Sequence, residues 1–117
     1  MRDDKENIIV SKTEDFALAI IEFSEKIYEM KRYRMADQIF GSGTSIGANI
    51  AEAQNAESKN DFIHKLKIAA KEADETAYWL KLCNRSQFYP SSPELYLKLQ
   101  DIQRILSKII SSSKAKP

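Results

Sequence analysis

The segment from Gln38 to Glu52, QIFGSGTSIGANIAE, contains all three glycines of the chain and no charged side chain before its last residue. At about 100° per residue, one face of a helix over this segment carries Ile39, Gly43, Ile46 and Ile50. The other positions are small or neutral, and a helix without a charged face has no side that is marked for solvent. The sequence therefore predicts a central helix that is buried on every side.

Two further stripes complete this helix. One is polar, with offsets of four and three, and consists of Gln38, Ser42, Ser45, Asn49 and Glu52; the other consists of Gly41, Thr44, Ala48 and Ala51. Each glycine in a helix interior costs on the order of 1 kcal/mol relative to alanine, which close approach of other helices would offset. We expect helix-packing or oligomer-interface contacts at Gln38, Ser42, Gly43, Ser45, Gly47, Asn49 and Glu52. The alternative is a monomer in which these neutral side chains face water.

A first helix is predicted ahead of this segment and a third after it. The capping-box pattern Ser11-x-x-Glu14 predicts where the first helix starts, and its apolar face is Phe16, Ile20, Phe23, Ile27 and Met30. Ser58 and Asp61 predict the start of the third helix, which runs to about Asn84. Its apolar face is Phe62, Leu66, Ala69, Ala73, Ala77, Leu80 and Cys83. The small residues in its middle are expected to let the glycine-rich helix approach.

A fourth helix begins at Ser92-Pro93, where a capping hydroxyl precedes proline at the first helical position. Its apolar residues keep a heptad-like spacing and are Leu95, Leu99, Ile102, Leu106 and Ile109. Residues 1–10 and 111–117 are expected to be flexible ends. No stretch alternates as a strand does, so the sequence predicts an all-α protein with an antiparallel up-and-down four-helix bundle over residues 1–117.

Length and charge describe one ordinary domain. The 117 residues contain 18 basic and 17 acidic side chains, a formal net charge of +1, which argues against a strongly electropositive surface for nucleic acid. The single cysteine, Cys83, cannot form an internal disulfide. The charged N-terminal residues are not typical of a signal peptide, and no stretch is apolar enough for a membrane span. We expect a cytoplasmic protein with no membrane partner.

Gly43-x-Ser45-x-Gly47 matches the nucleophile motif of some hydrolases, with Asp61 and His64 following in the right order. That motif works at a sharp strand-to-helix turn, and nothing before Ser45 has the pattern of a strand. We expect Ser45 to be a structural serine that bonds to a helix carbonyl or a neighbouring side chain. No phosphate-binding glycine loop is present either. The sequence predicts no catalytic residue, no cofactor and no small-molecule substrate.

Metal binding is also not expected. The carboxylates nearest the central helices are Glu52, Glu72 and Glu75, but the Glu-x-x-His pairs of di-metal helical bundles are missing. His64 and Cys83 alone cannot complete a structural zinc site. The basic residues Lys31, Arg32, Arg34 and Lys59 would form a small patch at one end of an antiparallel bundle. This patch is either a nucleic-acid contact or a solvated charge cluster.

Two stretches, SGTSIGAN at Ser42–Asn49 and SKNDFIHKLKIAAKEADETAYWLKL at Ser58–Leu82, resemble the bacterial four-helix-bundle family, also called 23S rRNA intervening-sequence proteins. Gly41 departs from the family pattern, in which arginine usually stands there. The resemblance implies a small helical bundle without enzymatic activity that forms a homo-oligomer, with a pentameric ring as the associated form. A related accessory protein of diversity-generating retroelements is a basic pentamer that engages nucleic acid and a reverse transcriptase.

Two functions of different class follow. The first is an oligomeric interaction scaffold, which pairs with itself and with a protein partner. The second is an RNA- or DNA-binding accessory protein. The near balance of charge favours the scaffold.

Overall fold

The computed structural model describes residues 4–116, and the side chains from Ile8 onward. Four helices make up the fold: α1 (Asp4–Glu29), α2 (Tyr33–Ala53), α3 (Lys59–Arg85) and α4 (Pro93–Ala115). Residues 4–116 contain no strand. The prediction of an all-α protein with four helices is therefore confirmed.

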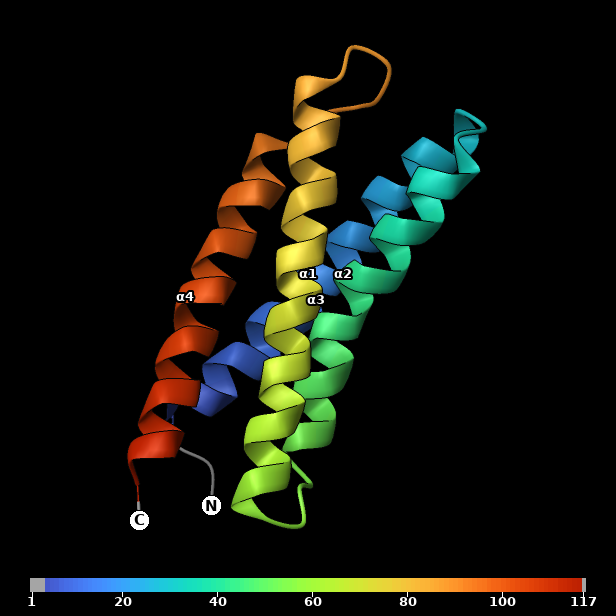
Figure 1. The fold of residues 1–117 in the computed structure, drawn as a ribbon. Coiled ribbons are helices and arrows are strands. Elements are labelled where there is room, and N and C mark those ends of the chain that lie inside the picture. The colour runs from blue at the N-terminus through green and yellow to red at the C-terminus, as the bar shows by residue number, and fades with distance from the viewer. Residues whose placement is uncertain (1–3, 117) are drawn as a thin grey trace.

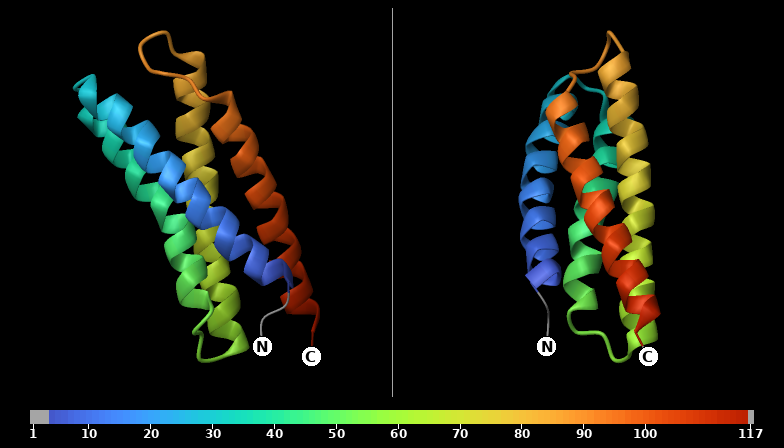
Figure 2. Two further views of the ribbon diagram at one scale, coloured as in Figure 1. Left: turned by 180° about the vertical axis from the view of Figure 1, so that it is seen from behind. Right: turned by 90° about the vertical axis from the view of Figure 1, so that its left-hand side faces the viewer.

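Each helix packs against two others. Helix α2 contacts α1 and α3, and α4 contacts the same two helices from the other side. The α1–α2 and α3–α4 connections lie at one end of the bundle, whereas the α2–α3 connection lies at the other, together with the start of α1 and the end of α4 (Figures 1 and 2). The two connections that share an end are far apart in the sequence, so residues near 32 and near 88 become neighbours.

The core consists of the apolar stripes that the spacing predicts. Ile20, Ile46, Leu80 and Leu99 represent the four helices and are completely buried. Burying one such side chain contributes roughly 1.5–3 kcal/mol, which is why the 3.6-residue periodicity fixes the inward face of each helix. Met30 is an exception, because it follows the last residue of α1 and is exposed. Thr76 is buried on α3 although it was not expected there.

The helix starts at Ser58 and Ser92 are confirmed. The Ser58 Oγ accepts a hydrogen bond from the Asp61 backbone N–H at 3.0 Å, and the Ser92 Oγ accepts one from the Leu95 N–H at 3.2 Å. Each bond satisfies a backbone donor that has no partner inside the first turn of a helix. Local side-chain chemistry thus fixes where α3 and α4 begin.

The outer ends of the chain are more helical than the sequence indicates. Helix α1 begins at Asp4, so Ser11 lies inside it instead of capping it. The reason is Ile9, which is buried in the core and extends the apolar stripe of α1 by about two turns beyond Phe16 toward the N-terminus. Helix α4 continues to Ala115, so residues 111–115 are helical as well. Residues 1–3 and 117 of the expected flexible ends lie outside the described part of the chain.

Within one chain α2 is not buried on every side, contrary to the prediction. Its neighbours α1 and α3 cover the face with Ile39, Ile46 and Ile50, while Phe40 on the outward face is 44% exposed. Two helices can cover only one side of a third, which leaves the opposite side open. Among the described residues, no helix is both long enough and apolar enough to span a membrane.

Candidate functional site

The glycines of α2 differ in what they face. A Cβ added to Gly43 would come within 2.7 Å of Ile20 Cγ2, and one added to Gly47 would come within 3.2 Å of the Thr13 backbone oxygen. Both neighbours belong to α1, so Gly43 and Gly47 of α2 let α1 approach closely. Gly41 differs, because an added Cβ would meet nothing within 4 Å.

Four members of the polar stripe of α2 have partners within the chain, and two of these, Ser42 and Glu52, contact α3. Ser42 is buried, with its Oγ 2.8 Å from the Thr76 Oγ1, whose hydroxyl also lies 2.8 Å from the Glu72 carbonyl oxygen. The half-buried Asn49 donates from Nδ2 to the Ser45 carbonyl oxygen at 2.8 Å. Glu52 is exposed and pairs with Lys65 at 3.1 Å.

Seven residues were predicted for helix packing or an oligomer interface, and they now fall into two groups. Ser42, Gly43 and Gly47 pack against neighbouring helices of the same chain. The others remain accessible or half-buried on α2, and they are Gln38, Ser45, Asn49 and Glu52. For this second group an oligomer contact stays a prediction.

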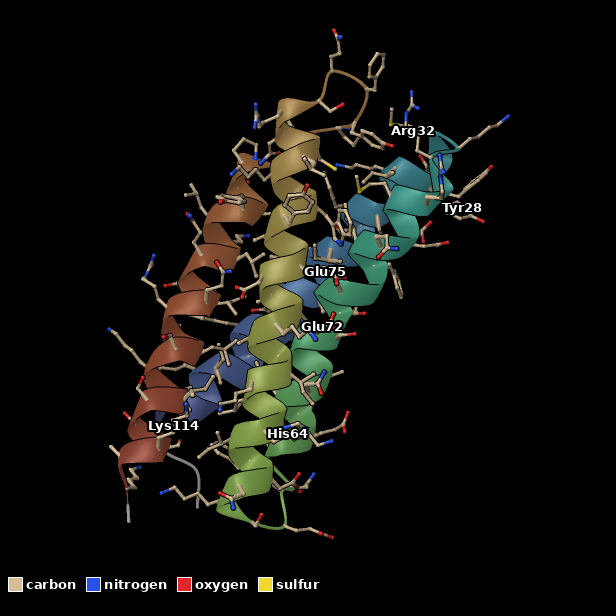
Figure 3. The ribbon with its side chains drawn as sticks, viewed as in Figure 1. Tyr28, Arg32, His64, Glu72, Glu75 and Lys114 are labelled. Atoms are coloured by element: carbon tan, nitrogen blue, oxygen red, sulfur yellow. The ribbon has the colours of Figure 1, made fainter. Side chains whose placement is uncertain are left out.

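Ser45 lies in the middle of α2, where its Oγ donates to the Gly41 carbonyl oxygen at 2.6 Å. A hydroxyl bonded to the carbonyl four residues earlier is a common arrangement for serine inside a helix. His64 is exposed in the second turn of α3, on the same side of the helix as Glu72 and Glu75. It lies near the end of the bundle that is far from Arg32 (Figure 3). The strand-to-helix turn that a nucleophilic serine needs is absent from residues 4–116.

The three carboxylates considered for metal binding have other neighbours. Burial and then the charge of Glu75 raise the pKa of Glu72, while Lys71 partly offsets them. Glu75 accepts a long hydrogen bond of 3.5 Å from the Trp79 indole, and Glu52 pairs with Lys65. No group of three or more metal-ligating side chains gathers anywhere in the described residues.

The four basic residues predicted to form one patch are divided between the two ends of the bundle. Lys31, Arg32 and Arg34 lie around the α1–α2 turn, but Lys59 opens α3 at the other end and its Nζ contacts the Lys116 backbone oxygen. The 21 residues of α2 separate them by about 30 Å at 1.5 Å per residue. A single patch of all four is therefore wrong, because a full helix separates Lys59 from the rest.

Aromatic side chains gather around the three basic residues that remain together. The Arg32 guanidinium lies 5.3 Å from the Tyr89 ring centroid and 5.9 Å from that of Phe88, both in the α3–α4 loop. The rings of Tyr28 and Tyr33 have centroids 4.7 Å apart, and Figure 3 shows Tyr28 and Arg32 at the same end of the molecule. We call this group the basic–aromatic end; it consists of Tyr28, Lys31, Arg32, Tyr33, Arg34, Phe88 and Tyr89.

A hollow of about 220 Å³ opens within the basic–aromatic end. Its lining is Lys31, Arg32, Tyr33, Arg34, Met35 and Tyr89, which includes three cations and no carboxylate. The sequence shows Phe88 and Tyr89 as loop residues, but it gives no sign that they meet Arg32 from across the bundle. The one sequence signal that marks Phe88 and Tyr89 is their position, because they are aromatic residues in a short loop before Pro90.

Lys31, two residues after the end of α1, has a backbone conformation that glycine normally supplies. Its φ is 63°, and it is the one non-glycine residue with positive φ among residues 4–116. The Arg32 N–H bonds back to the Ile27 carbonyl at 3.3 Å and the Lys31 N–H to Tyr28 at 2.8 Å, the pattern of a left-handed helix cap. A lysine there costs about 1 kcal/mol relative to glycine. The chain thus has a charged side chain at a position where the backbone conformation favours glycine, which has no side chain.

A second group of cations lies at the opposite end, beside the end of α4. Lys67 lowers the pKa of Lys114, first through a hydrogen bond between the two amines and then through its charge. Figure 3 places Lys114 and His64 at this end, away from Arg32. The two ends of the bundle therefore differ in chemistry, because both cation–π contacts within residues 4–116 involve Arg32 at the α1–α2 end.

Comparisons with known proteins identify relatives of the whole bundle. The model of the family described as 23S rRNA-intervening sequence protein matches residues 5–108. A crystal structure of a protein with unknown function from the S23 ribosomal protein family of Bacteroides thetaiotaomicron has 41% sequence identity and a TM-score of 0.84, over 92% of this chain and 98% of that one. No curated protein matches the chain. The residues that the family model matches span α2 and the basic–aromatic end.

Proposed function

Because the chain belongs to the 23S rRNA-intervening sequence protein family, we propose that it is a non-enzymatic, homo-oligomeric interaction scaffold. The solved relative is itself a protein with unknown function, so the proposal draws on the surfaces of this chain. Its building block is an antiparallel up-and-down bundle in the cytoplasm. The assembly is ring-like, with a pentamer as the form that the family resemblance implies.

The observation that carries this proposal is the outward face of α2. Between Asp37 and Glu52, which are both exposed, the exposed or half-buried positions of this face are Phe40, Gly41, Thr44, Ala48 and Ala51, none of them charged. Outward positions of the other helices carry charges such as Glu22, Lys71 and Lys108. A helix face that stays in water is normally charged, so a neutral face with an exposed aromatic ring favours contact with another protein surface.

Gly41 supports self-association independently. Gly43 and Gly47 have α1 against them, but no described residue of another helix lies within 4 Å of the missing Cβ of Gly41. A glycine on an open helix face costs about 1 kcal/mol relative to alanine and gains nothing within one chain. The adjoining Phe40 is 44% exposed. A second copy that packs closely on this face would cover the ring and use the space above Gly41.

Sedimentation equilibrium tests the scaffold. We expect one discrete species larger than a monomer for the native chain, and dissociation of the Ala48→Arg variant, because the new charge would lie in the interface. Ser107→Arg on the exposed side of α4 is the matched control and should keep the native mass. Circular dichroism confirms that both variants stay helical. A native chain that is monomeric at high micromolar concentration rules out the proposal, and an unchanged mass for Ala48→Arg rules out the α2 face.

The basic–aromatic end favours a second function, that of a nucleic-acid-binding accessory protein. Three cations and four aromatic rings share one end of the bundle. Purification at low salt, followed by nuclease digestion and identification of what was bound, tests this function. We expect RNA or DNA to accompany the native protein and to leave it as salt rises.

A further inference from the structure

The cations of the basic–aromatic end are not neutralised by the ion pairs of the described residues. Those pairs join Lys12 and Arg104 to Asp101, Lys65 to Glu52 and Lys98 to Glu94. Lys31, Arg32 and Arg34 take part in none of these, and the hollow that they line contains no carboxylate. Glu29 and Asp37 precede and follow this segment but do not line the hollow. The positive charges of Lys31, Arg32 and Arg34 are therefore available to pair with an anionic ligand.

The aromatic rings at this end are open to a ligand. Phe88 is 61% exposed, and Tyr28 and Tyr33 are each about half exposed. Soluble proteins bury rings of this size where they can, so exposed rings at one end of the bundle, of which Tyr33 lines the hollow, offer a surface onto which a flat, partly apolar group can stack. An anion alone, such as an acidic peptide, would use the cations and leave the rings uncovered.

Arg32 holds the two halves of this surface together. Its guanidinium lies within 6 Å of both ring centroids in the α3–α4 loop, while its backbone belongs to the α1–α2 turn. The contact is a cation–π interaction, which fixes the loop relative to the turn. Lys31 and Arg34, on either side of Arg32 and Tyr33, are both exposed. The arrangement thus combines exposed charge and exposed rings on one positioned surface.

Unpaired nucleotides match both features at once. Each carries a phosphate that pairs with a cation and a base whose face stacks on an aromatic ring, whereas a duplex offers its phosphates but hides its base faces. We propose that the basic–aromatic end binds single-stranded nucleic acid, with bases stacking on Tyr28, Tyr33 and Phe88 and phosphates pairing with Lys31 and Arg34. This inference rests on the second proposed function and names its ligand and its contact surface.

Fluorescence anisotropy with labelled oligonucleotides of one length tests the proposal. The probes are a single-stranded RNA, the same sequence as single-stranded DNA, the RNA duplex, and an abasic strand that keeps the phosphates. We expect both single strands to bind at least about tenfold more tightly than the abasic strand, since stacking strengthens binding substantially per base. Single-stranded RNA and DNA distinguish the source of the nucleotides, because only RNA offers the 2′-hydroxyl.

Two variants locate the surface. Lys31→Gly removes a charge at a position with φ of 63°, where glycine is favoured, so a loss of binding cannot be attributed to unfolding. Phe88→Ala removes an exposed ring without opening the core. We expect each to weaken single-strand binding about fivefold or more, and Lys31→Gly to reduce the slope of log affinity against log salt by about one. Lys108→Ala, at an exposed position of α4, is the control and should bind like the native chain.

The outcomes separate this inference from the function on which it rests. If single strands bind the native chain and bind Lys31→Gly and Phe88→Ala equally tightly, the proposed surface is wrong and nucleic acid binds elsewhere on the protein. Equal affinity for the duplex, the abasic strand and the single strands would also contradict the inference that bases stack on the aromatic rings. If no probe binds while polyglutamate does, the ligand is an acidic protein and both the inference and the accessory function fail.

Discussion

The Thr76 hydroxyl lies 2.8 Å from the Ser42 hydroxyl in the buried contact between α3 and α2. Thr76 is also 2.8 Å from the Glu72 carbonyl oxygen, which can only accept a hydrogen bond. Thr76 has one hydroxyl proton, so both contacts are satisfied when it donates to Glu72 and accepts from Ser42. A polar pair inside an otherwise apolar contact is thus fully bonded.

We expect the Ser42 and Thr76 hydroxyls to be energetically coupled. Thr76→Val leaves the buried Ser42 hydroxyl without this partner and should lower the free energy of unfolding by about 1–3 kcal/mol. Ser42→Ala should cost less, because Thr76 keeps its bond to the Glu72 carbonyl. Urea denaturation of both single variants and the double variant measures the coupling. Strictly additive losses would show that the two hydroxyls do not bond.

Alanine should have opposite effects at two glycines that lie two residues apart. Gly41→Ala adds a methyl group in space that the same chain leaves open, so at concentrations too low for self-association we expect a gain of about 1 kcal/mol from helix propensity. Gly43→Ala would bring that methyl group within 2.7 Å of the buried Ile20 side chain, which should lower stability by about 1–3 kcal/mol. Thermal unfolding of the dissociated monomer compares them. At concentrations where the homo-oligomer forms, the gain from Gly41→Ala should disappear, because the proposed second copy packs on this face; a gain that persists there would contradict that packing.

Cys83 should be almost unreactive in the folded protein. Burial raises the pKa of its thiol to about 11 from the ordinary 9.0, so the thiolate fraction near pH 8 falls about 100-fold, in addition to the steric cover. We expect labelling by an aromatic disulfide reagent to be complete within minutes in strong denaturant and far slower in buffer. Fast labelling of the folded chain would show that the C-terminal part of α3 opens readily.

Replacement of Glu72 should change stability in a pH-dependent way. Burial first, and then Glu75, raise the pKa of Glu72, so the folded state favours its neutral form. The stability that protonation contributes is present below the ordinary value of 4.5 and is lost as pH rises through the raised pKa. Glu72→Gln, which is always neutral, should therefore raise the melting temperature at pH 7 but not at pH 3.

A control and a contrary outcome complete the Glu72 experiment. Glu57→Gln, at an exposed carboxylate in the α2–α3 connection, should leave the melting temperature unchanged at both values of pH. A gain for Glu72→Gln that is equally large at pH 3 would mean that packing, and not charge, explains it.

The secondary structure of this protein could be predicted because its causes are local. Ser58 and Ser92 cap helices through atoms three residues away, and the apolar stripe from Leu95 to Ile109 follows from the helix repeat alone. The first helix shows the limit of such reasoning. A capping pattern at Ser11 indicates a start there, but burial of Ile9 outweighs it and extends α1 to Asp4.

The candidate surfaces depended on the tertiary structure, because they are made by residues that are distant in the sequence. Periodicity places Gly41, Gly43 and Ser42 on different sides of α2, but it does not say that α1 lies against Gly43, α3 against Ser42 and nothing against Gly41. Which neighbour covers which side depends on how all four helices rotate to bury their apolar stripes together.

The sequence alone determined the four helices, their inward faces and the balance of charge, since each of these follows from the spacing and chemistry of nearby residues. One of these helices separates Lys59 from Arg34. Only the packed bundle decided that Arg32 meets Phe88 and Tyr89 of a loop more than fifty residues later. The physical reason is that helix order and length set which connections share an end of the bundle, and side chains at a shared end meet whatever their distance along the chain.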